Sequence, residues 1–450
     1  MDDTFFKYCR FFIPEKRRVL MVGCRDIDFL SGLHPLPGVG VTIDDGRNHD
    51  AEENIQGITW QHITDLAAFQ PEQRFDYIIL HDILQSVFDV RAFLVRLRDM
   101  AGPETRVIIN SRNPGWRFLP AGRRDNRMAC RQIRHNCFYR RDLNNFLLIS
   151  GYDIIKEENY VLLTWTIPFL TTAANRFLAK LPLLRRCCLG YFTVAGPHAP
   201  PENVREATVS VVLTCRDEEG NIEGLVERIP DMGRKTEIIF VEGHSRDHTV
   251  DKINEMIRKY PEKDIKLYHQ PGIGQGDAFR TGFDRAEGDF LIWLEADLTT
   301  PPEEARHIWA AYAAGLGEYV NGTRFVYPMA PKAMPAANNL GNRFFSRVMS
   351  MVTGQRFTDT LCGFKGIPRN RYNEIINNPS SFDKLDPFGD FLLILGAVKH
   401  NLKIAEIPLH YQPREYGQPK AYGRSVTGLL THAWVLLKIC WQSFIEFRLL

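Results

Sequence analysis

Short apolar runs alternate with segments of mixed polarity along most of the chain. Four such runs in the first half lie within 17–24, 38–45, 75–84 and 106–113. In the second half, apolar runs followed by a polar turn and a helical pattern lie within 207–229, 236–253 and 265–298. Strands that alternate with helices are typical of parallel α/β domains, so the pattern predicts two doubly wound α/β domains.

One segment rich in proline and polar residues separates the two patterned halves. It reads AGPHAPPENVREA and runs from Ala195 to Ala207. A chain of 450 residues is also too long for one ordinary hydrophobic core. We therefore expect a first domain, a linker, a second domain and a C-terminal helix, with the bounds 1–195, 196–206, 207–425 and 426–450.

Composition and charge narrow the class of protein. Hydrophobic residues make up 44% of the chain and charged residues 24%, which is typical of a soluble globular protein. The formal net charge is only +2, which argues against a general nucleic-acid binder. The nine cysteines form no CxxC pair, which indicates reduced thiols in an intracellular protein.

An apolar run in the second half ends in two carboxylates one residue apart. The stretch GDFLIWLEADLTTPPEE places Glu295 and Asp297 where the expected strand leaves the core. Side chains two positions apart on a strand point to the same face, so both carboxylates can approach one ion. Mg²⁺ and Mn²⁺ bind such oxygens and leave positions for substrate phosphates. The alternative is a surface acidic pair that caps the helix after Pro301-Pro302.

Six blocks of the second half, in this order, resemble the family 2 glycosyltransferases with the GT-A fold. They are RDEEGNI, VEGHSRDHT, GIGQGDAFRTGFDRAEGD, LEADLTTPPE, DTLCGFKG and FGDFLLILGAVKHNLKIAEIPLHY. The resemblance covers nearly all of 207–425 and points to the dolichol-phosphate mannose synthase-like and polyprenyl-glycosyltransferase branches. It implies an inverting transfer of a sugar from a nucleotide-sugar donor.

The resemblance also implies a nucleotide-binding set in the turns after the strands of this domain. Its members are Thr214, Arg216, Glu218, Glu242, Gly274, Gly276, Asp277, Arg280 and Glu295. Asp297 falls on the last position of the family's Asp-x-Asp, which implies a direct metal ligand with a catalytic role. Glu295 takes the first position as a second metal ligand, one methylene longer than the family's Asp.

Further along, the resemblance implies residues that face the acceptor. Asp390 matches an acidic position that serves as general base in many relatives. Transfer to a hydroxyl needs such a base, whereas a lipid phosphate is already an anion. Five basic residues are candidates for binding the donor diphosphate or a lipid phosphate, with an ordinary surface role as the alternative for each: Arg324, Arg343, Lys365, Arg414 and Lys420.

The first half resembles a class I S-adenosylmethionine-dependent methyltransferase domain over roughly residues 15–195. Gly23 ends the first expected strand and Asp44 the second, where that family binds its cofactor. The glycines expected after Gly23 are replaced by Arg25-Asp26-Ile27. The alternative is therefore a fold retained without a working cofactor site. A fusion of this kind ahead of a glycosyltransferase occurs in bacterial bifunctional proteins.

The C-terminal stretch from Gly428 to Leu450 is rich in Leu and Trp and carries few charges. Lys438 near its middle makes a membrane span costly, which favours a helix lying in the membrane interface. A helix of the protein core is the alternative. We expect no signal peptide and a peripheral protein on the cytoplasmic, inner face of the cell membrane.

Taken together, the sequence predicts an inverting, metal-dependent glycosyltransferase of bacterial glycan biosynthesis. Its partners are a nucleotide-sugar donor and a membrane-associated acceptor, either a polyprenyl phosphate or a glycan, and no nucleic acid. One alternative is a bifunctional enzyme that also transfers methyl groups from S-adenosylmethionine. Another is a degenerate transferase that acts as a scaffold or partner subunit. The oligomeric state stays open.

Overall fold

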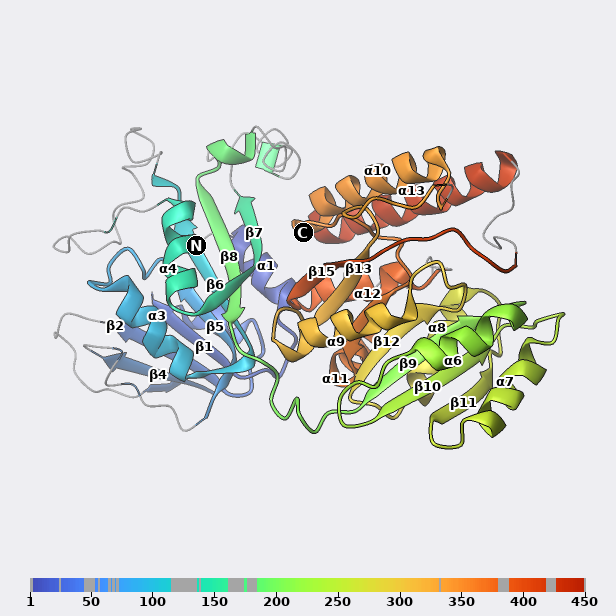
Figure 1. The fold of residues 1–450 in the computed structure, drawn as a ribbon. Helices are drawn as coiled ribbons and strands as arrows, with labels where there is room; N and C mark the ends of the chain where they lie inside the picture. Colours follow the sequence, from blue (N-terminus) through green and yellow to red (C-terminus); the bar gives the residue numbers. More distant parts are fainter. Residues whose placement is uncertain are drawn as a thin grey trace. The chain divides into compact units, whose positions relative to one another are not determined.

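The computed structural model describes residues 3–448 except for 24–25, 44–52, 56, 64–65, 67–68, 70–72, 115–135, 137–138, 161–173, 176–183, 332, 379–387 and 418–425. The chain forms two compact units that divide between His198 and Ala199. Each unit is built on one sheet with helices packed on it, so the predicted α/β class is confirmed for both halves (Figure 1). The segment expected as a linker, 196–206, begins inside the last strand of unit 1, which ends at Pro197.

Unit 1 contains an eight-stranded sheet of order β3-β4-β2-β1-β5-β6-β8-β7. Its strands are β1 (Val19–Gly23), β2 (Gly38–Ile43), β3 (Glu53–Ile55), β4 (Ile58–Ile63), β5 (Phe75–His81), β6 (Ala101–Arg112), β7 (Tyr152–Tyr160) and β8 (Gly190–Pro197). The strands from β4 to β6 are parallel, and β3 and β8 are antiparallel to their neighbours. The strand order reverses at β1, so the carboxyl ends of β1 and β5 form the switch point of this sheet.

The helices of unit 1 within the described residues are short and amphipathic. They are α1 (Asp3–Phe12), α2 (Ile27–Ser31), α3 (Val90–Asp99), α4 (Arg140–Ile149) and the 3₁₀ turn Leu184–Cys187. In α3, the buried Val90, Phe93, Leu94 and Leu97 recur at helical spacing and form one apolar face. The helix starts there because the Asp89 side chain accepts a hydrogen bond from the backbone N–H of Ala92.

Unit 2 contains a seven-stranded sheet of order β11-β10-β9-β12-β14-β13-β15. Its strands are β9 (Val209–Cys215), β10 (Thr236–Glu242), β11 (Asp264–His269), β12 (Phe290–Glu295), β13 (Tyr319–Thr323), β14 (Lys365–Pro368) and β15 (Ile404–Pro408). β11, β10, β9 and β12 are parallel, whereas β14 runs antiparallel to both β12 and β13. The apolar runs of β9 and β12 are buried along almost their whole length because helices cover parallel sheets.

In unit 2, a helix follows each of the four parallel strands β9, β10, β11 and β12, as the sequence predicts. The helices within the described residues are α6 (Ile222–Arg228), α7 (Thr249–Lys259), α8 (Gln275–Arg285), α9 (Ala305–Ala313), α10 (Ala336–Thr353), α11 (Arg369–Asn377), α12 (Asp390–Lys399) and α13 (Val426–Arg448). α12 is buried from Asp390 to Val398, so it is a helix of the core. This burial explains its almost uniformly apolar sequence.

The C-terminal helix α13 lies beside α10 (Figure 1). The sulfur atoms of Cys440 on α13 and Met349 on α10 are 3.8 Å apart. Leu436, Ile439 and Phe447 are buried, so one face of α13 packs on unit 2 as the core-helix alternative requires. Its opposite face is exposed. Within the described part of the chain, none of the helices combines the length and apolarity that a membrane span requires.

Candidate functional site

The candidate site of unit 2 lies where its central parallel strands end. β9 is the middle strand of three, with β10 on one side and β12 on the other. Glu242 and Glu295 are the last residues of β10 and β12, and Glu218 lies in the turn after β9. Because the carboxyl ends of parallel strands share one edge of the sheet, these acidic side chains gather at that edge.

Glu295, the last residue of β12, is partly buried. Its Oε1 accepts a hydrogen bond of 2.5 Å from Nε2 of Gln275, in the first turn of α8. Its carboxylate also lies against Gly363, where any side chain would collide with it. Burial raises the pKa of Glu295, and the nearby Asp297 carboxylate raises it further. Two acidic groups this close in a buried place attract a cation.

Asp297 uses its two carboxylate oxygens differently. Oδ1 accepts hydrogen bonds from the backbone N–H of Thr299 at 3.0 Å and from its hydroxyl at 2.7 Å. Oδ2 accepts a hydrogen bond of 2.6 Å from Nη2 of Arg414. The turn therefore fixes one oxygen and leaves the other to a positively charged partner.

Arg414 links two of the acidic residues. Its second guanidinium nitrogen, Nη1, donates to Oε1 of Glu218 at 2.9 Å, while Nη2 is bound to Asp297. Glu218 is buried, and its Oε2 accepts a hydrogen bond of 2.6 Å from Asn221. A positive charge thus already sits between Glu218 and Asp297.

These residues meet the chemical requirements of a divalent cation. The oxygens of Glu295 and Asp297 are hard ligands, and the guanidinium on Asp297 occupies a place suited to positive charge. No three His, Cys, Asp or Glu side chains within the described residues lie close enough to hold a metal ion between them. A cation at Asp297 and Glu295 would have coordination positions for oxygens of the substrate.

The rest of the predicted nucleotide set lies around the same edge. Glu242 accepts hydrogen bonds from the backbone of Ser245 and from Nδ1 of His269, the latter at 3.0 Å. Burial alone would raise the pKa of Glu242, but these hydrogen bonds outweigh it and hold the pKa below its usual value. The Thr214 hydroxyl accepts a hydrogen bond from the indole of Trp293, and the Arg216 side chain is about half exposed.

The Gly-rich turn before α8 adopts a conformation that needs glycine. Gly274 precedes the helix with φ of +97°, a region that side chains rarely enter. Asp277 closes the turn by accepting a hydrogen bond of 2.8 Å from the backbone N–H of Gly272. Gly276 is buried, and the guanidinium of Arg280 lies 5.9 Å from the ring centre of Phe279.

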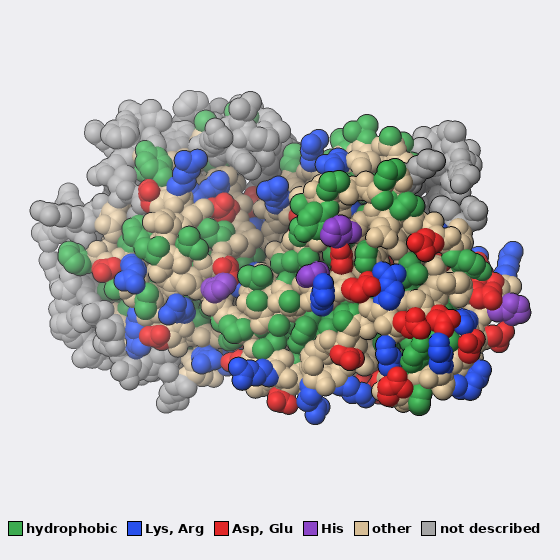
Figure 2. Space-filling model, viewed as in Figure 1, with side chains coloured by type: hydrophobic (Ala, Val, Ile, Leu, Met, Phe, Trp, Pro, Cys, Tyr) green, Lys and Arg blue, Asp and Glu red, His purple; other side chains and the backbone are tan. Residues whose placement is uncertain are grey.

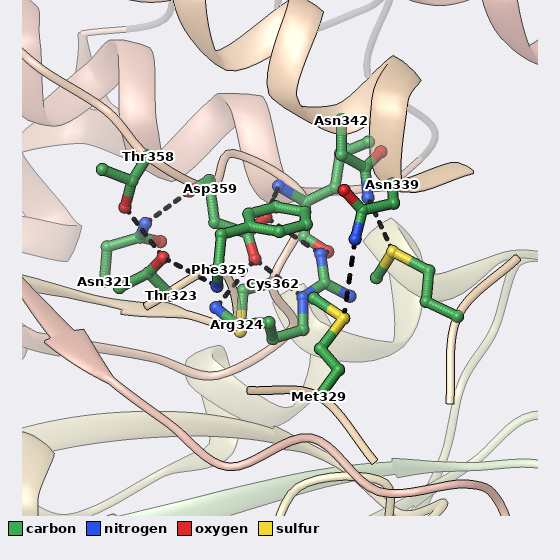
Figure 3. A network of polar contacts seen from close by, with 12 residues as sticks. Asn321, Thr323, Arg324, Phe325, Met329, Asn339, Asn342, Thr358, Asp359 and Cys362 are labelled. Carbon is green, nitrogen blue, oxygen red and sulfur yellow. Dashed lines mark hydrogen bonds and ion pairs between the residues drawn. The ribbon is translucent and has the colours of Figure 1, made fainter. Parts of the chain in front are cut away.

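Arg324, predicted to bind phosphate, is already engaged by a carboxylate (Figure 3). Its Nε and Nη2 donate to the two oxygens of Asp359 at 2.7 and 2.9 Å, and both side chains are buried. Nη2 also donates to the carbonyl of Leu361 at 2.7 Å. Asn321 donates to the carbonyl of Asp359 at 2.6 Å. Arg324 therefore holds the loop of the DTLCG block in place.

The other residues predicted on the acceptor side also differ in whether an oppositely charged side chain already pairs with them. Lys365 is buried and its Nζ lies 2.9 Å from Oδ1 of Asp390, so the predicted base already has a cationic partner. Arg343 is on α10, where it donates to Oδ1 of Asn339 at 2.8 Å and lies over the ring of Phe325. Lys420 lies outside the described residues.

Several residues of the site were not predicted from the sequence. A small polar cleft is lined by Leu294, Glu295, Asp297, Thr299, Thr300, Arg324, Cys362, Gly363, Phe364 and Tyr411. Gln275, Gly363 and Tyr411 come from three separate segments, and each lies in one of the six blocks that carry the resemblance. Membership of those blocks is the signal that could have marked them.

Several side chains of unit 1 gather around Gly23 and His81, near the predicted cofactor position. Gly23 has φ of +139° and lies against the backbone of His81 at the end of β5. Asp26 caps α2 by accepting a hydrogen bond of 2.8 Å from the backbone N–H of Phe29. The rings of Phe5 and Phe29 lie 5.6 and 6.4 Å from that of His81. The turn that follows Gly23, at 24–25, and Asp44 both lie outside the described residues.

Comparisons with known proteins bear on unit 2. Residues 210–375 match the family model described as glycosyl transferase family 2. The chain is 28% identical over 242 residues to a dolichol-phosphate mannosyltransferase of Pyrococcus furiosus, covering 53% of this chain and 65% of the relative. It is 24% identical over 221 residues to an undecaprenyl-phosphate 4-deoxy-4-formamido-L-arabinose transferase of Shewanella sediminis, covering 48% and 62%. The chain thus spans less than two thirds of the length of these relatives.

Among solved structures, a similar one is glucosyl-3-phosphoglycerate synthase from Mycobacterium tuberculosis in complex with Mn²⁺ and uridine-diphosphate-glucose. The two chains are 15% identical, with a TM-score of 0.38 over 54% of this chain and 85% of that one. The match to the family model begins in β9 and ends in α11, so it includes Glu218, Glu242, Glu295 and Asp297. Unit 2 is therefore similar to glycosyl transferase family 2 over residues 210–375.

Proposed function

We propose that unit 2 transfers a sugar, with inversion, from a nucleotide-sugar donor to a lipid-linked acceptor. The observation that carries this proposal is the meeting of Glu218, Glu295 and Asp297 at one edge of the sheet in a domain similar to glycosyl transferase family 2. The names of two relatives, which act on dolichol phosphate and undecaprenyl phosphate, support a polyprenyl phosphate as acceptor.

The donor's nucleotide would lie along the ends of β9 and β10, with Glu242 at its ribose or base. Asp297 and Glu295 would hold Mg²⁺ or Mn²⁺, together with oxygens of the donor diphosphate. A cation in that place neutralises the charge that builds up on the departing nucleoside diphosphate. The hydrogen bonds of Thr299 orient Asp297, and that of Gln275 orients Glu295.

The Lys365–Asp390 ion pair favours a phosphate acceptor over a hydroxyl. A general base must accept a proton, and a buried ammonium 2.9 Å from the carboxylate opposes this. An acceptor phosphate is already an anion and needs no base. In this proposal Lys365 and Asp390 shape the acceptor side of the site, and Asp390 removes no proton.

An exposed apolar surface on α10 and α13 supports work at a membrane. Leu340 and Phe344 of α10 and Trp434 and Trp441 of α13 are exposed to between 54% and 72%. Nζ of Lys438 lies 5.4 Å from the ring centre of Trp434. Hydrophobic side chains with Lys and Arg among them lie over this region in Figure 2. Aromatic and basic residues together suit the lipid headgroup layer, so we propose peripheral binding at the cytoplasmic face.

For unit 1, we propose a methyltransferase-like fold that does not bind S-adenosylmethionine. The switch point at β1 and the position of Gly23 support the likeness. The capping role of Asp26 and the aromatic rings of Phe5 and Phe29 support the loss of the cofactor site. We therefore rank a bifunctional enzyme that also transfers methyl groups below an enzyme that transfers only the sugar.

The metal assignment is tested by titration calorimetry of the full chain with a panel of nucleoside diphosphates and Mn²⁺. Asp297→Ala should abolish metal-dependent nucleotide binding, because it removes the oxygen that faces the cation. The matched control is Asp251→Ala, which removes an exposed carboxylate of α7. Nucleotide binding by Asp297→Ala as tight as that of the unaltered chain would refute the proposal, and no binding by the unaltered chain would favour a degenerate scaffold.

A further inference from the structure

The segment Leu409–Gly417, here called the strap, crosses the carboxyl end of β12. The backbone N–H of His410 donates to the Glu304 carboxylate at 3.0 Å, and that of Gln412 donates to the carbonyl of Thr299 at 2.8 Å. The Tyr411 side chain helps to line the polar cleft beside Asp297. The strap is thus attached to the turn that carries the candidate metal ligand.

The far end of the strap reaches the turn after β9. The ring of Tyr416 lies against Gly220, and a Cβ there would come within 2.5 Å of Cδ2 of the ring. Gly417, with φ of +78°, lies close to the carbonyl of Asp217 and to the Glu218 carboxylate. The strap therefore covers the place where the proposed nucleotide would enter.

Arg414 is the charged contact between the strap and the site. Its guanidinium binds Oδ2 of Asp297 and Oε1 of Glu218, and only 19% of its side chain is exposed. Of these two partners, Asp297 is the proposed metal ligand. A guanidinium and a divalent cation cannot both occupy the free side of Oδ2, so they compete for it.

We infer that Arg414 is the counter-ion of the donor-free site and exchanges its carboxylate partners for the donor diphosphate when a divalent cation binds. This inference rests on the proposed function. A cation alone must displace Nη2 of Arg414 from Asp297, which leaves a largely buried guanidinium with only one of its two carboxylate partners, Glu218. A cation that arrives with a diphosphate supplies a new anionic partner, because guanidinium groups pair well with phosphate oxygens.

The exchange has a thermodynamic consequence. The cation and the nucleotide must bind with positive coupling, and Arg414 carries part of the coupling free energy. The same exchange would release the strap from Asp297 and Glu218, so that Tyr416 could leave the nucleotide position. A divalent cation that arrives without the donor would then bind only weakly to the site.

The test measures Mn²⁺ binding to the full chain by electron paramagnetic resonance of free Mn²⁺, with and without the nucleoside diphosphate selected by the panel. For the unaltered chain we expect Mn²⁺ alone to bind weakly. Its affinity should rise about tenfold or more when nucleotide is present. Arg414→Gln should bind Mn²⁺ alone about tenfold more tightly and lose most of the gain from nucleotide.

Arg234→Gln is the matched control, because it removes the same charge from unit 2 just before β10 begins, away from the edge that carries Asp297. The ion pair of Arg234 with Glu206 is exposed and spans 4.0 Å, so its removal should change Mn²⁺ affinity by less than about twofold. The inference would be overturned if both variants bound Mn²⁺ alone more tightly to the same extent, or if Arg414→Gln bound it no more tightly than the unaltered chain. Melting temperatures of both variants establish that they are folded.

The outcomes also separate this inference from the proposed function. If the unaltered chain binds no nucleotide with Mn²⁺, the proposed function fails, whatever Arg414 does. If nucleotide binding depends on Mn²⁺ and on Asp297, but Mn²⁺ alone binds equally to the unaltered chain and Arg414→Gln, the function stands and the exchange is refuted.

Discussion

The basic side chains around the site differ mainly in how they are paired. Arg324 and Lys365 are buried, and each has a carboxylate within 3 Å. Arg414 is less buried and joins two separate carboxylates of the site. A buried and fully paired cation stabilises the fold, whereas a cation shared between site carboxylates can change partners. Basic residues that look alike in sequence thus have different roles.

Replacing Arg324 should destabilise unit 2 strongly. Arg324→Met leaves Asp359 as a buried carboxylate without its partner, at a cost of about 3–5 kcal/mol. The measurement is the midpoint of urea unfolding, followed by Trp fluorescence. The double variant Arg324→Met/Asp359→Leu removes both charges and should recover much of the loss. A single variant as stable as the unaltered chain would contradict the paired role of Arg324.

Glu242 should contribute stability that depends on pH. Its pKa lies below the ordinary value of about 4.3 in the folded chain. The contribution is therefore fully present above that ordinary pKa and is lost as pH falls through the lowered pKa. The free energy of unfolding of Glu242→Gln at pH 7 should be lower than that of the unaltered chain. It should also change less as the solution is acidified below pH 5. The exposed Glu255→Gln should keep the pH dependence of the unaltered chain.

At the scale of elements, α13 has two faces with different tasks. Leu436, Ile439 and Phe447 are buried, whereas Trp434 and Trp441 are more than half exposed. Deleting the residues after Thr427 would expose the side chains of unit 2 on which the buried face of α13 packs. Substitution of the exposed face alone is the cleaner experiment.

The exposed face of α13 should control membrane binding. The double variant Trp434→Ser/Trp441→Ser should bind vesicles of anionic phospholipid more than about tenfold more weakly, as measured by sedimentation. A tenfold change is only about 1.4 kcal/mol of binding free energy, and the loss of two Trp side chains should exceed it. Metal-dependent nucleotide binding should be unchanged. Leu316→Ser, which removes another exposed apolar side chain of unit 2, is the control. Equal vesicle binding by the double variant and the unaltered chain would exclude this face as the membrane contact.

At the scale of the whole molecule, the two units differ in how their switch-point edges are used. Unit 2 presents carboxylates at its edge, while unit 1 presents the rings of Phe5, Phe29 and His81. Burial lowers the pKa of His81. The central parallel strands thus end beside carboxylates in unit 2 and beside aromatic rings in unit 1.

The full chain should show no binding of S-adenosylmethionine by calorimetry. The reason is that the sequence after Gly23 lacks the glycines of a cofactor turn and that Asp26 serves as the cap of α2. Nucleoside diphosphate and Mn²⁺, added to the same sample, provide the control for folded protein. A dissociation constant in the low micromolar range for S-adenosylmethionine would restore the bifunctional alternative.

The α/β class, the two halves, the strands that end in Glu242 and Glu295, and the turn that carries Asp297 follow from local sequence. Apolar runs of strand length must be buried, and polar turns must come to the surface, wherever the neighbouring elements lie. These features depend on residues close together in the chain, so the sequence alone predicts them.

The pairing of the charged side chains is decided only by the tertiary structure. Arg414 lies 117 residues after Asp297 and 196 after Glu218, and Arg324 lies 35 residues before Asp359. No local pattern distinguishes a guanidinium that locks a loop from one that faces a ligand. That distinction depends on which carboxylates the folded sheet brings within hydrogen-bond distance and on how far water is excluded from them.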